Sequence, residues 1–199
     1  MTKIIKILIT LFSVLIIFLL PIFFIVWQSN IFIPQTPTQE IPELSESDYR
    51  KYQSQTLGFL LNKNQLPVQM TEAEVSHMED VKNVFVVSMG VLFFSIFLIT
   101  FLVFKIKNKY VWQAFKKSSI IAILIIILLL ILSLFNFENL FIYFHEIFFP
   151  QGNWLFAPSS LMVQVFPEEL FKKLTISSFS ISIIFALSLL FFSFNKIRK

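Results

Sequence analysis

Four long apolar runs without a charged residue constrain the fold of this chain more than any other feature. The first, Ile7 to Trp27, has 21 residues. At 1.5 Å per residue it would make about 31 Å of helix, enough to cross a bilayer core of roughly 30 Å. Further runs occupy about 84–104, 118–135 and 174–194. The sequence therefore predicts an all-α integral membrane protein with four transmembrane helices.

The composition agrees with this interpretation and excludes several functions. Hydrophobic residues make up 56% of the chain and charged residues only 14%, whereas charged residues are nearer a quarter of a soluble domain. The chain has no cysteine, which excludes disulfides, a thiolate nucleophile and cysteine metal ligands. The net charge of +4 comes from basic residues in short segments beside the apolar runs. That pattern is typical of membrane orientation and not of nucleic-acid binding.

The charges also predict an orientation for a single membrane domain, 1–199. Two basic residues precede the first run, five lie between the second and third, and three follow the fourth, whereas every acidic residue falls within 28–83 or 136–173. Because basic residues favour the cytoplasmic side, we expect both termini inside and these two segments in a small extracytoplasmic cap. The first run could instead be a cleaved signal peptide. It lacks a following small-residue cleavage site, so we interpret it as a retained helix.

Local patterns indicate the structure of the first cap segment. Residues 34–50 are rich in proline and acid and are expected to be irregular, and Tyr49 to Leu61 is expected to form a short interfacial helix. Thr71-Glu72-Ala73-Glu74 has the pattern of a capping box, in which threonine and glutamate satisfy each other's backbone amides. A helix should therefore begin there and continue into the second span.

The only two histidines of the chain, His77 and His145, both fall in the predicted cap. Asp80 follows His77 by three residues, and a carboxylate on one ring nitrogen fixes the tautomer and raises the basicity of the other nitrogen. Glu74 is equally near but is better explained by the capping box. We therefore expect Asp80 to contact the His77 ring.

His145 has a different setting. Helical spacing puts it on one stripe with phenylalanines, so the imidazole should lie among phenyl rings; the members of the stripe are Phe137, Phe141, Phe144 and Phe148. After Pro150 a polar turn of Gln151, Gly152 and Asn153 should present Trp154, a ring suited to the boundary between lipid and water.

Other kinds of chemistry find little support in the sequence. A zinc site needs three or four ligands, and without cysteine these would have to come from two histidines in distant segments and from carboxylates. Ser159 and Ser160 lack the glycine turn that exposes a hydrolase serine. With three glycines in the chain, no phosphate-binding loop is present. We expect no metal and no cofactor.

Two stretches resemble the bacterial lipoprotein intramolecular transacylases. They are EAEVSHMEDVK, from Glu72 to Lys82, and YFHEIFFPQGNWLFAPSSLMVQVFPEELF, from Tyr143 to Phe171. The resemblance implies a cell-membrane enzyme that acts on diacylglyceryl-modified lipoproteins. It would move the sn-2 acyl chain to the α-amine of the N-terminal cysteine, giving the lyso form. The family's catalytic histidines would fall on His77 and His145.

This chemistry suits the residues, because ester aminolysis needs a base for the amine proton, an acid for the departing oxygen and donors for the oxyanion. Candidate substrate-binding residues are Asp80, Tyr143, Asn153 and Trp154, and the aromatic rings would hold acyl chains of lipid. Two alternatives remain open at this point. One is a non-catalytic membrane partner or immunity-type protein whose cap binds another protein, and the other is a lipid hydrolase that releases fatty acid.

Overall fold

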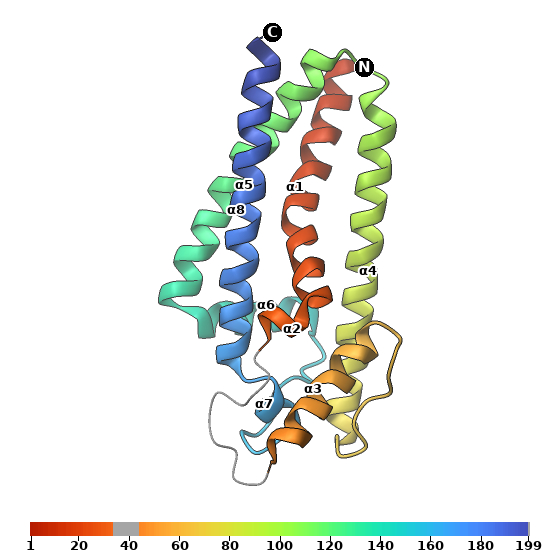
Figure 1. Ribbon diagram of the computed structural model, residues 1–199, viewed down its shortest axis with the longest axis vertical. Coiled ribbons are helices and arrows are strands. Elements are labelled where there is room, and N and C mark those ends of the chain that lie inside the picture. Colours follow the sequence, from red (N-terminus) through yellow and green to blue (C-terminus); the bar gives the residue numbers. More distant parts are fainter. Residues whose placement is uncertain (34–43, 199) are drawn as a thin grey trace. The chain divides into compact units, whose positions relative to one another are not determined.

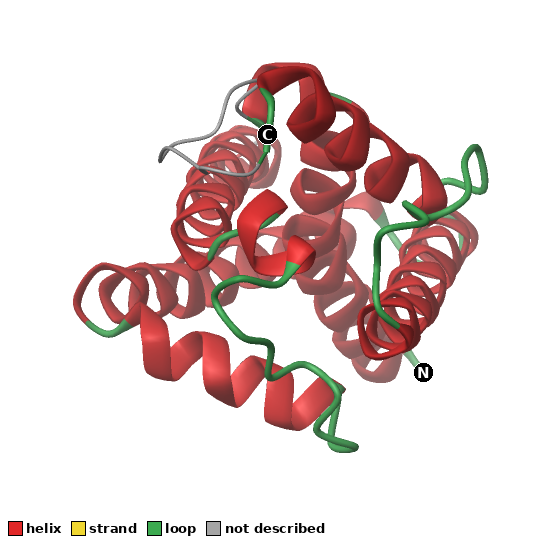
Figure 2. Ribbon diagram, turned by 90° about the horizontal axis from the view of Figure 1, so that it is seen from below, coloured by secondary structure: helices red, strands yellow, loops and turns green. Residues whose placement is uncertain are grey.

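The computed structural model describes residues 1–33 and 44–198, and every regular element in this part of the chain is a helix (Figure 2). The prediction of an all-α protein is confirmed. The ten residues 34–43, on which most of the expected irregular segment falls, lie outside the described residues. The elements are α1 (Thr2–Trp27), α2 (Ser29–Phe32), α3 (Glu46–Leu60), α4 (Glu72–Val103), α5 (Asn108–Phe135), α6 (Phe137–Phe148), α7 (Leu161–Val165) and α8 (Glu168–Arg198).

Four of these helices, α1, α4, α5 and α8, are long and apolar enough to cross a membrane (Figure 1). Each predicted span falls on one of these helices, with α4 ending one residue before the end of the predicted span 84–104, and the prediction of four transmembrane helices is confirmed. Three of them begin well before the apolar run, α4 at Glu72, α5 at Asn108 and α8 at Glu168. Pro21 lies inside α1, as proline can in a membrane helix whose neighbours accommodate the missing hydrogen bond.

The chain divides into two compact units, and the first, the membrane-helix unit, comprises Met1–Ile25, Ser88–Phe135 and Thr175–Lys199. In this unit α1 contributes to both core clusters. Its partners there include small residues, which allow membrane helices to approach closely. One cluster contains Ile5, Ile9, Leu102 and Ala114, and the other Ile17, Ala122, Ile126 and Ala186.

The second unit, the histidine unit, comprises Val26–Val87 and Asn136–Leu174. Tyr49 and Tyr52 of α3 pack on Val165 of α7, and a second cluster contains Met70, Met78 and Met162. The helix expected from Tyr49 is present but begins at Glu46. Its earlier start follows from Ser45, whose side-chain oxygen accepts a hydrogen bond from the Asp48 amide at 3.1 Å, as an N-cap does.

The capping box at the start of α4 is confirmed. The Glu74 amide donates to Thr71 Oγ1 at 3.3 Å, and the Thr71 amide donates to Glu74 Oε2 at 2.8 Å. The other carboxylate oxygen, Oε1, accepts from the Met162 amide at 2.8 Å. Glu74 is 1% exposed. This buried carboxylate therefore joins the first turn of α4 to α7.

Candidate active site

The two histidines lie face to face within the histidine unit, although they are distant in sequence. His77 belongs to the second turn of α4 and His145 to the last turn of α6. Their ring centroids are 6.0 Å apart and their planes differ by 28°. Only 6% of His77 and 8% of His145 are exposed. The structure therefore provides a buried pair of nearly parallel imidazoles.

Aromatic rings surround this pair. The centroid of His77 lies 4.9 Å from that of Phe149 and 5.6 Å from that of Phe156. The centroid of His145 lies 4.1 Å from that of Phe141 and 4.8 Å from that of Trp154. Rings of this kind supply apolar walls, so the imidazoles lie where water has little access.

The expected stripe on α6 is present, and its last member, Phe148, packs on Phe144 with ring centroids 4.7 Å apart. Phe137 packs on Phe141, with centroids 6.1 Å apart, and Phe144 contacts His145 at 5.5 Å. Phe148 is 47% exposed. The helix ends there, and the polar turn after Pro150 is present, with Gly152 at φ +77°, a conformation that glycine adopts without strain.

A backbone carbonyl fixes the tautomer of His145. Its Nδ1 lies 2.7 Å from the carbonyl oxygen of Phe141. A carbonyl can only accept, so Nδ1 carries the proton and donates. In the neutral ring, Nε2 is then left with a free lone pair. His145 is therefore arranged as a proton acceptor.

The surroundings of His77 differ from the prediction. Asp80 Oδ2 accepts hydrogen bonds from Asn153 Nδ2 and from Gln151 Nε2, both at 2.7 Å. Among the described residues, no hydrogen-bond partner is found for His77 Nδ1. The expected direct hydrogen bond from His77 to Asp80 is therefore wrong. The Asp80 carboxylate instead contacts the polar turn of residues 151–153. Helical spacing around His77 carries no information on that distant segment.

Burial lowers the pKa of both imidazoles. Burial, and to a smaller extent the neighbouring His145, lower the pKa of His77 to about 4, although the Asn153 amide and the Asp80 charge act in the opposite direction. Burial also lowers the pKa of His145, opposed by its bond to the Phe141 carbonyl. Desolvation favours the uncharged form of a base. At neutral pH both rings are thus neutral.

The remaining candidate residues divide into two groups. Trp154, Asn153 and Asp80 join the histidines: Trp154 packs on His145, and Asn153 is hydrogen-bonded to Asp80. Tyr143 does not. It is 60% exposed, and the structure gives it no hydrogen bond to either ring within the described part of the chain.

Sequence reasoning missed three residues of the site, namely Gln151 as a partner of Asp80 and Phe149 and Phe156 as walls beside His77. A signal for the two phenylalanines was available, since FFP and LFAP flank the polar turn on both sides. Nothing in the spacing of Gln151 indicates its contact, because the two residues are far apart in sequence.

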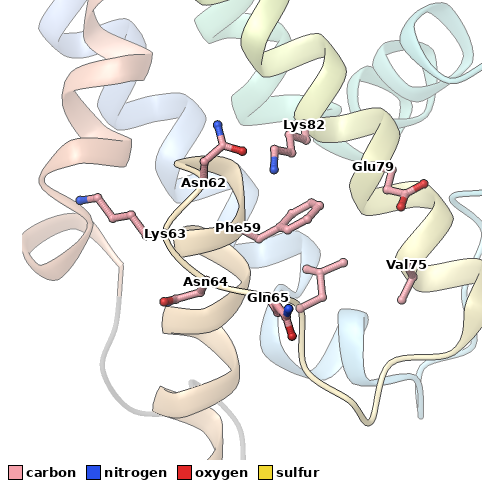
Figure 3. A pocket seen from close by; sticks show the side chains of 9 residues that line it. Phe59, Asn62, Lys63, Asn64, Gln65, Val75, Glu79 and Lys82 are labelled. Atoms are coloured by element: carbon pink, nitrogen blue, oxygen red, sulfur yellow. The ribbon is translucent and has the colours of Figure 1, made fainter.

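An open groove of about 460 Å³ lies elsewhere in the histidine unit, between α4 and the end of α3 with its following loop (Figure 3). Lys82 Nζ lies 4.0 Å above the centroid of Phe59 there. None of the described residues that line the groove is a candidate site residue. A metal site has no support either, since no group of three or more histidine, aspartate or glutamate side chains in the described segments could hold an ion.

The described residues therefore form an all-helical, multi-pass membrane protein with a buried pair of imidazoles. The family model of the lipoprotein intramolecular transacylase Lit matches residues 4–171. The chain therefore belongs to the family of lipoprotein intramolecular transacylases, and the resemblance noted in the sequence is confirmed.

Solved structures show the same fold. The membrane-integral lipoprotein intramolecular transacylase Lit from Bacillus cereus is similar with a TM-score of 0.78 and 21% identity, over 100% of this chain and 98% of that one. Two variants of the Bacillus cereus protein, each with one histidine substituted, give TM-scores of 0.72 and 0.74 at 20% identity; they cover 100% of this chain and 94% and 96% of theirs. A comparison with curated protein sequences finds no match. The fold and family together indicate a bacterial membrane protein.

Proposed function

We propose that this protein moves the sn-2 acyl chain of a diacylglyceryl-modified lipoprotein to the α-amine of its N-terminal cysteine. The product is the lyso-form lipoprotein, and the reaction takes place at the outer face of the bacterial cell membrane. Family membership supports the reaction class. The observation that carries the proposal is the pair of buried, neutral imidazoles with ring centroids 6.0 Å apart.

The reaction needs proton transfers that two such rings can perform. The amine nitrogen forms a bond to the ester carbonyl carbon and loses a proton to an imidazole lone pair. The bond from that carbon to the glyceryl oxygen then breaks, and the imidazolium returns a proton to the departing oxygen. Atoms and charge balance without a co-reactant. An imidazole of lowered pKa is a weaker base but, once protonated, a stronger acid for the second transfer.

Positioning supplies a large part of the rate in this proposal. Amine and ester belong to one molecule, so a site that folds the lipid against the N-terminus replaces a bimolecular encounter by an intramolecular one. The aromatic rings around the histidines offer walls for the acyl chain, and Trp154, which packs on His145, is a candidate for contact with the glyceryl headgroup. Exclusion of water by these walls protects the ester from hydrolysis.

Purified protein in detergent, given a synthetic diacylglyceryl lipopeptide and no other lipid, tests the reaction. Intramolecular transfer should leave the intact mass unchanged, and the α-amine should stop reacting with amine reagents. Mild alkali should remove the remaining ester-linked chain and leave one amide-linked chain. A gain of acyl mass would indicate transfer from another lipid, a loss would indicate a hydrolase, and an unchanged free amine would leave only a binding role.

Substitution of each histidine tests the assignment of the two rings. His77→Gln and His145→Gln should each lower kcat/KM by at least about 100-fold, the scale of general acid–base catalysis. Glu79→Gln on α4 and Glu146→Gln on α6 are matched controls, because both glutamates are exposed neighbours of the same helices. The two-imidazole mechanism is wrong if either histidine variant keeps the activity of its control.

A further inference from the structure

Asn153 has an orientation that its hydrogen bonds determine. Its side-chain nitrogen donates to Asp80 Oδ2 at 2.7 Å and to Ser76 Oγ at 3.3 Å. An ionised carboxylate only accepts, so the amide nitrogen and not the amide oxygen must face Asp80. The oxygen, Asn153 Oδ1, therefore points away from the carboxylate. It is buried and finds no partner among the described residues.

A complementary atom lies on the same face of α4. Ser76 and Asp80, which Asn153 bridges, flank His77 by one residue and by three, so the amide lies over the helix surface that carries the imidazole. His77 Nδ1 is likewise buried and unpartnered in the described structure. One buried acceptor and one buried ring nitrogen that can donate are each costly alone, and a hydrogen bond between them satisfies both.

We propose that Asn153 is a positioning residue that accepts a hydrogen bond from His77 Nδ1–H, and that Asp80 and Ser76 act through it by fixing the amide. His77 then has the same tautomer as His145, with the proton on Nδ1 and a free lone pair on Nε2. The two rings therefore both begin the reaction as proton acceptors. The catalytic consequence of this inference rests on the proposed function, whereas the tautomer of His77 does not depend on it.

A neutral amide between ring and carboxylate has a chemical advantage. A carboxylate in direct contact would fix the same tautomer but would also stabilise the imidazolium, raising the basicity of the ring. The amide fixes the tautomer and keeps the charge of Asp80 one side chain away. This arrangement agrees with the pKa of His77, which stays below its ordinary value although Asp80 is near.

Nitrogen NMR of the imidazoles tests the inference without an activity assay. The chain has two histidines, so protein labelled with ¹⁵N-histidine gives two ring systems, and the His145→Gln variant leaves the His77 ring alone for assignment. At pH 7.5 in detergent, the ring couplings should show a pyrrole-type Nδ1 and a pyridine-type Nε2 for His77. The Asn153→Ala variant should give a mixture of tautomers. A His77 ring protonated on Nε2, or one unchanged by Asn153→Ala, would overturn the proposal.

Three further variants separate positioning from folding. Gln151→Ala removes the other hydrogen bond to the same Asp80 oxygen and should leave the His77 tautomer unchanged. Asp80→Asn removes the acceptor that orients the amide, so it should give mixed tautomers and lower kcat/KM by up to roughly 100-fold, the scale of a misplaced reacting group. Combining Asp80→Asn with Asn153→Asp exchanges amide and carboxylate. The combination should restore the single tautomer and move the acid limb of the pH profile to higher pH, because the carboxylate then contacts the ring.

These measurements distinguish the inference from the proposed function. A single Nδ1–H tautomer that depends on Asn153, in a protein that does not convert the lipopeptide, would support the inference and contradict the proposed function. Conversion of the lipopeptide by a protein whose His77 tautomer does not depend on Asn153 would support the proposed function and contradict the inference. A double variant with mixed tautomers would show that the carboxylate and amide do not act as a pair, and would overturn the role given to Asp80.

Discussion

At the scale of single residues, the site combines two opposite demands on His77. Its ring must hold a defined tautomer, which requires polar neighbours, and it must stay neutral, which requires burial. In the proposed arrangement Asn153 meets the first demand, and Phe149 and Phe156, which pack on the ring, contribute to the second. The low pKa of the ring shows that burial outweighs the nearby carboxylate.

This balance predicts a pH-dependent stability. The pKa of His77 falls from 6.5 in the unfolded chain to about 4 in the folded one. Between these values the unfolded state binds more protons, so the free energy of unfolding should be highest above pH 6.5 and decrease as the pH falls toward 4. The full loss from this one group is roughly 3 kcal/mol, at 1.36 kcal/mol per pKa unit. His145, whose pKa is also lowered, adds a loss in the same direction.

Thermal unfolding in detergent across this pH range measures the effect. Carboxylates also titrate there, so the relevant quantity is the difference between wild type and His77→Phe at each pH. The variant should become more stable relative to wild type as the pH falls from 7 to 4.5, because a phenyl ring takes no proton. A difference that stays constant with pH would contradict a buried neutral His77.

The sequence predicts only part of this site. Helical periodicity gave the aromatic setting of His145, and the capping box gave the helix that carries His77. Only the family resemblance implied that the two histidines serve one site, because spacing along one chain carries no information on contacts between distant segments. The same limit explains the error over Asp80, whose partners Asn153 and Gln151 lie some 70 residues away.

At the scale of elements, α4 links the two units, since residues 72–87 belong to the histidine unit and residues from 88 to the membrane-helix unit. Its capping box and apolar run predicted this continuous helix. The contact of Glu74 with α7 could not be predicted, because a capping glutamate needs only one of its two oxygens. The second oxygen satisfies an amide in the first turn of α7, which also favours a nearby negative charge.

Substitution of Glu74 should therefore disturb more than a helix end. In Glu74→Gln one acceptor oxygen becomes an amide nitrogen that faces a donor, so either the Thr71 or the Met162 amide is left unsatisfied in a buried setting. The expected loss of stability is about 1–3 kcal/mol, larger than the usual cost of losing a cap alone. Glu72→Gln, on the exposed side of the same turn, is the matched control.

Limited proteolysis and thermal unfolding report the two consequences separately. The Glu74→Gln protein should be cleaved faster near α7 while α4 keeps its helicity, and it should unfold at lower temperature than the control. Equal stability of the two variants would show that the Met162 contact contributes nothing.

At the scale of the whole molecule, the charge distribution predicts an orientation in the membrane that the helices alone do not. Basic residues gather at the start of α1, from the loop after α4 into the first part of α5, and at the end of α8, whereas every acidic residue falls within the two segments of the histidine unit. The positive-inside bias predicts that both termini face the cytoplasm and that the imidazole pair faces outward. That orientation would put the imidazole pair at the outer face, where the proposed reaction takes place.

Cysteine labelling in intact cells checks the orientation, and the chain suits the method because it has no native cysteine. Ser47→Cys lies on the exposed surface of α3, and Lys107→Cys lies in the exposed loop between α4 and α5. An impermeant maleimide should label the first in intact cells and the second only after lysis. Each variant is the control for the other, since both sites are accessible once the membrane is broken. Labelling of Lys107→Cys in intact cells together with protection of Ser47→Cys would reverse the topology, and it would move the imidazole pair to the side of the membrane away from its proposed substrate.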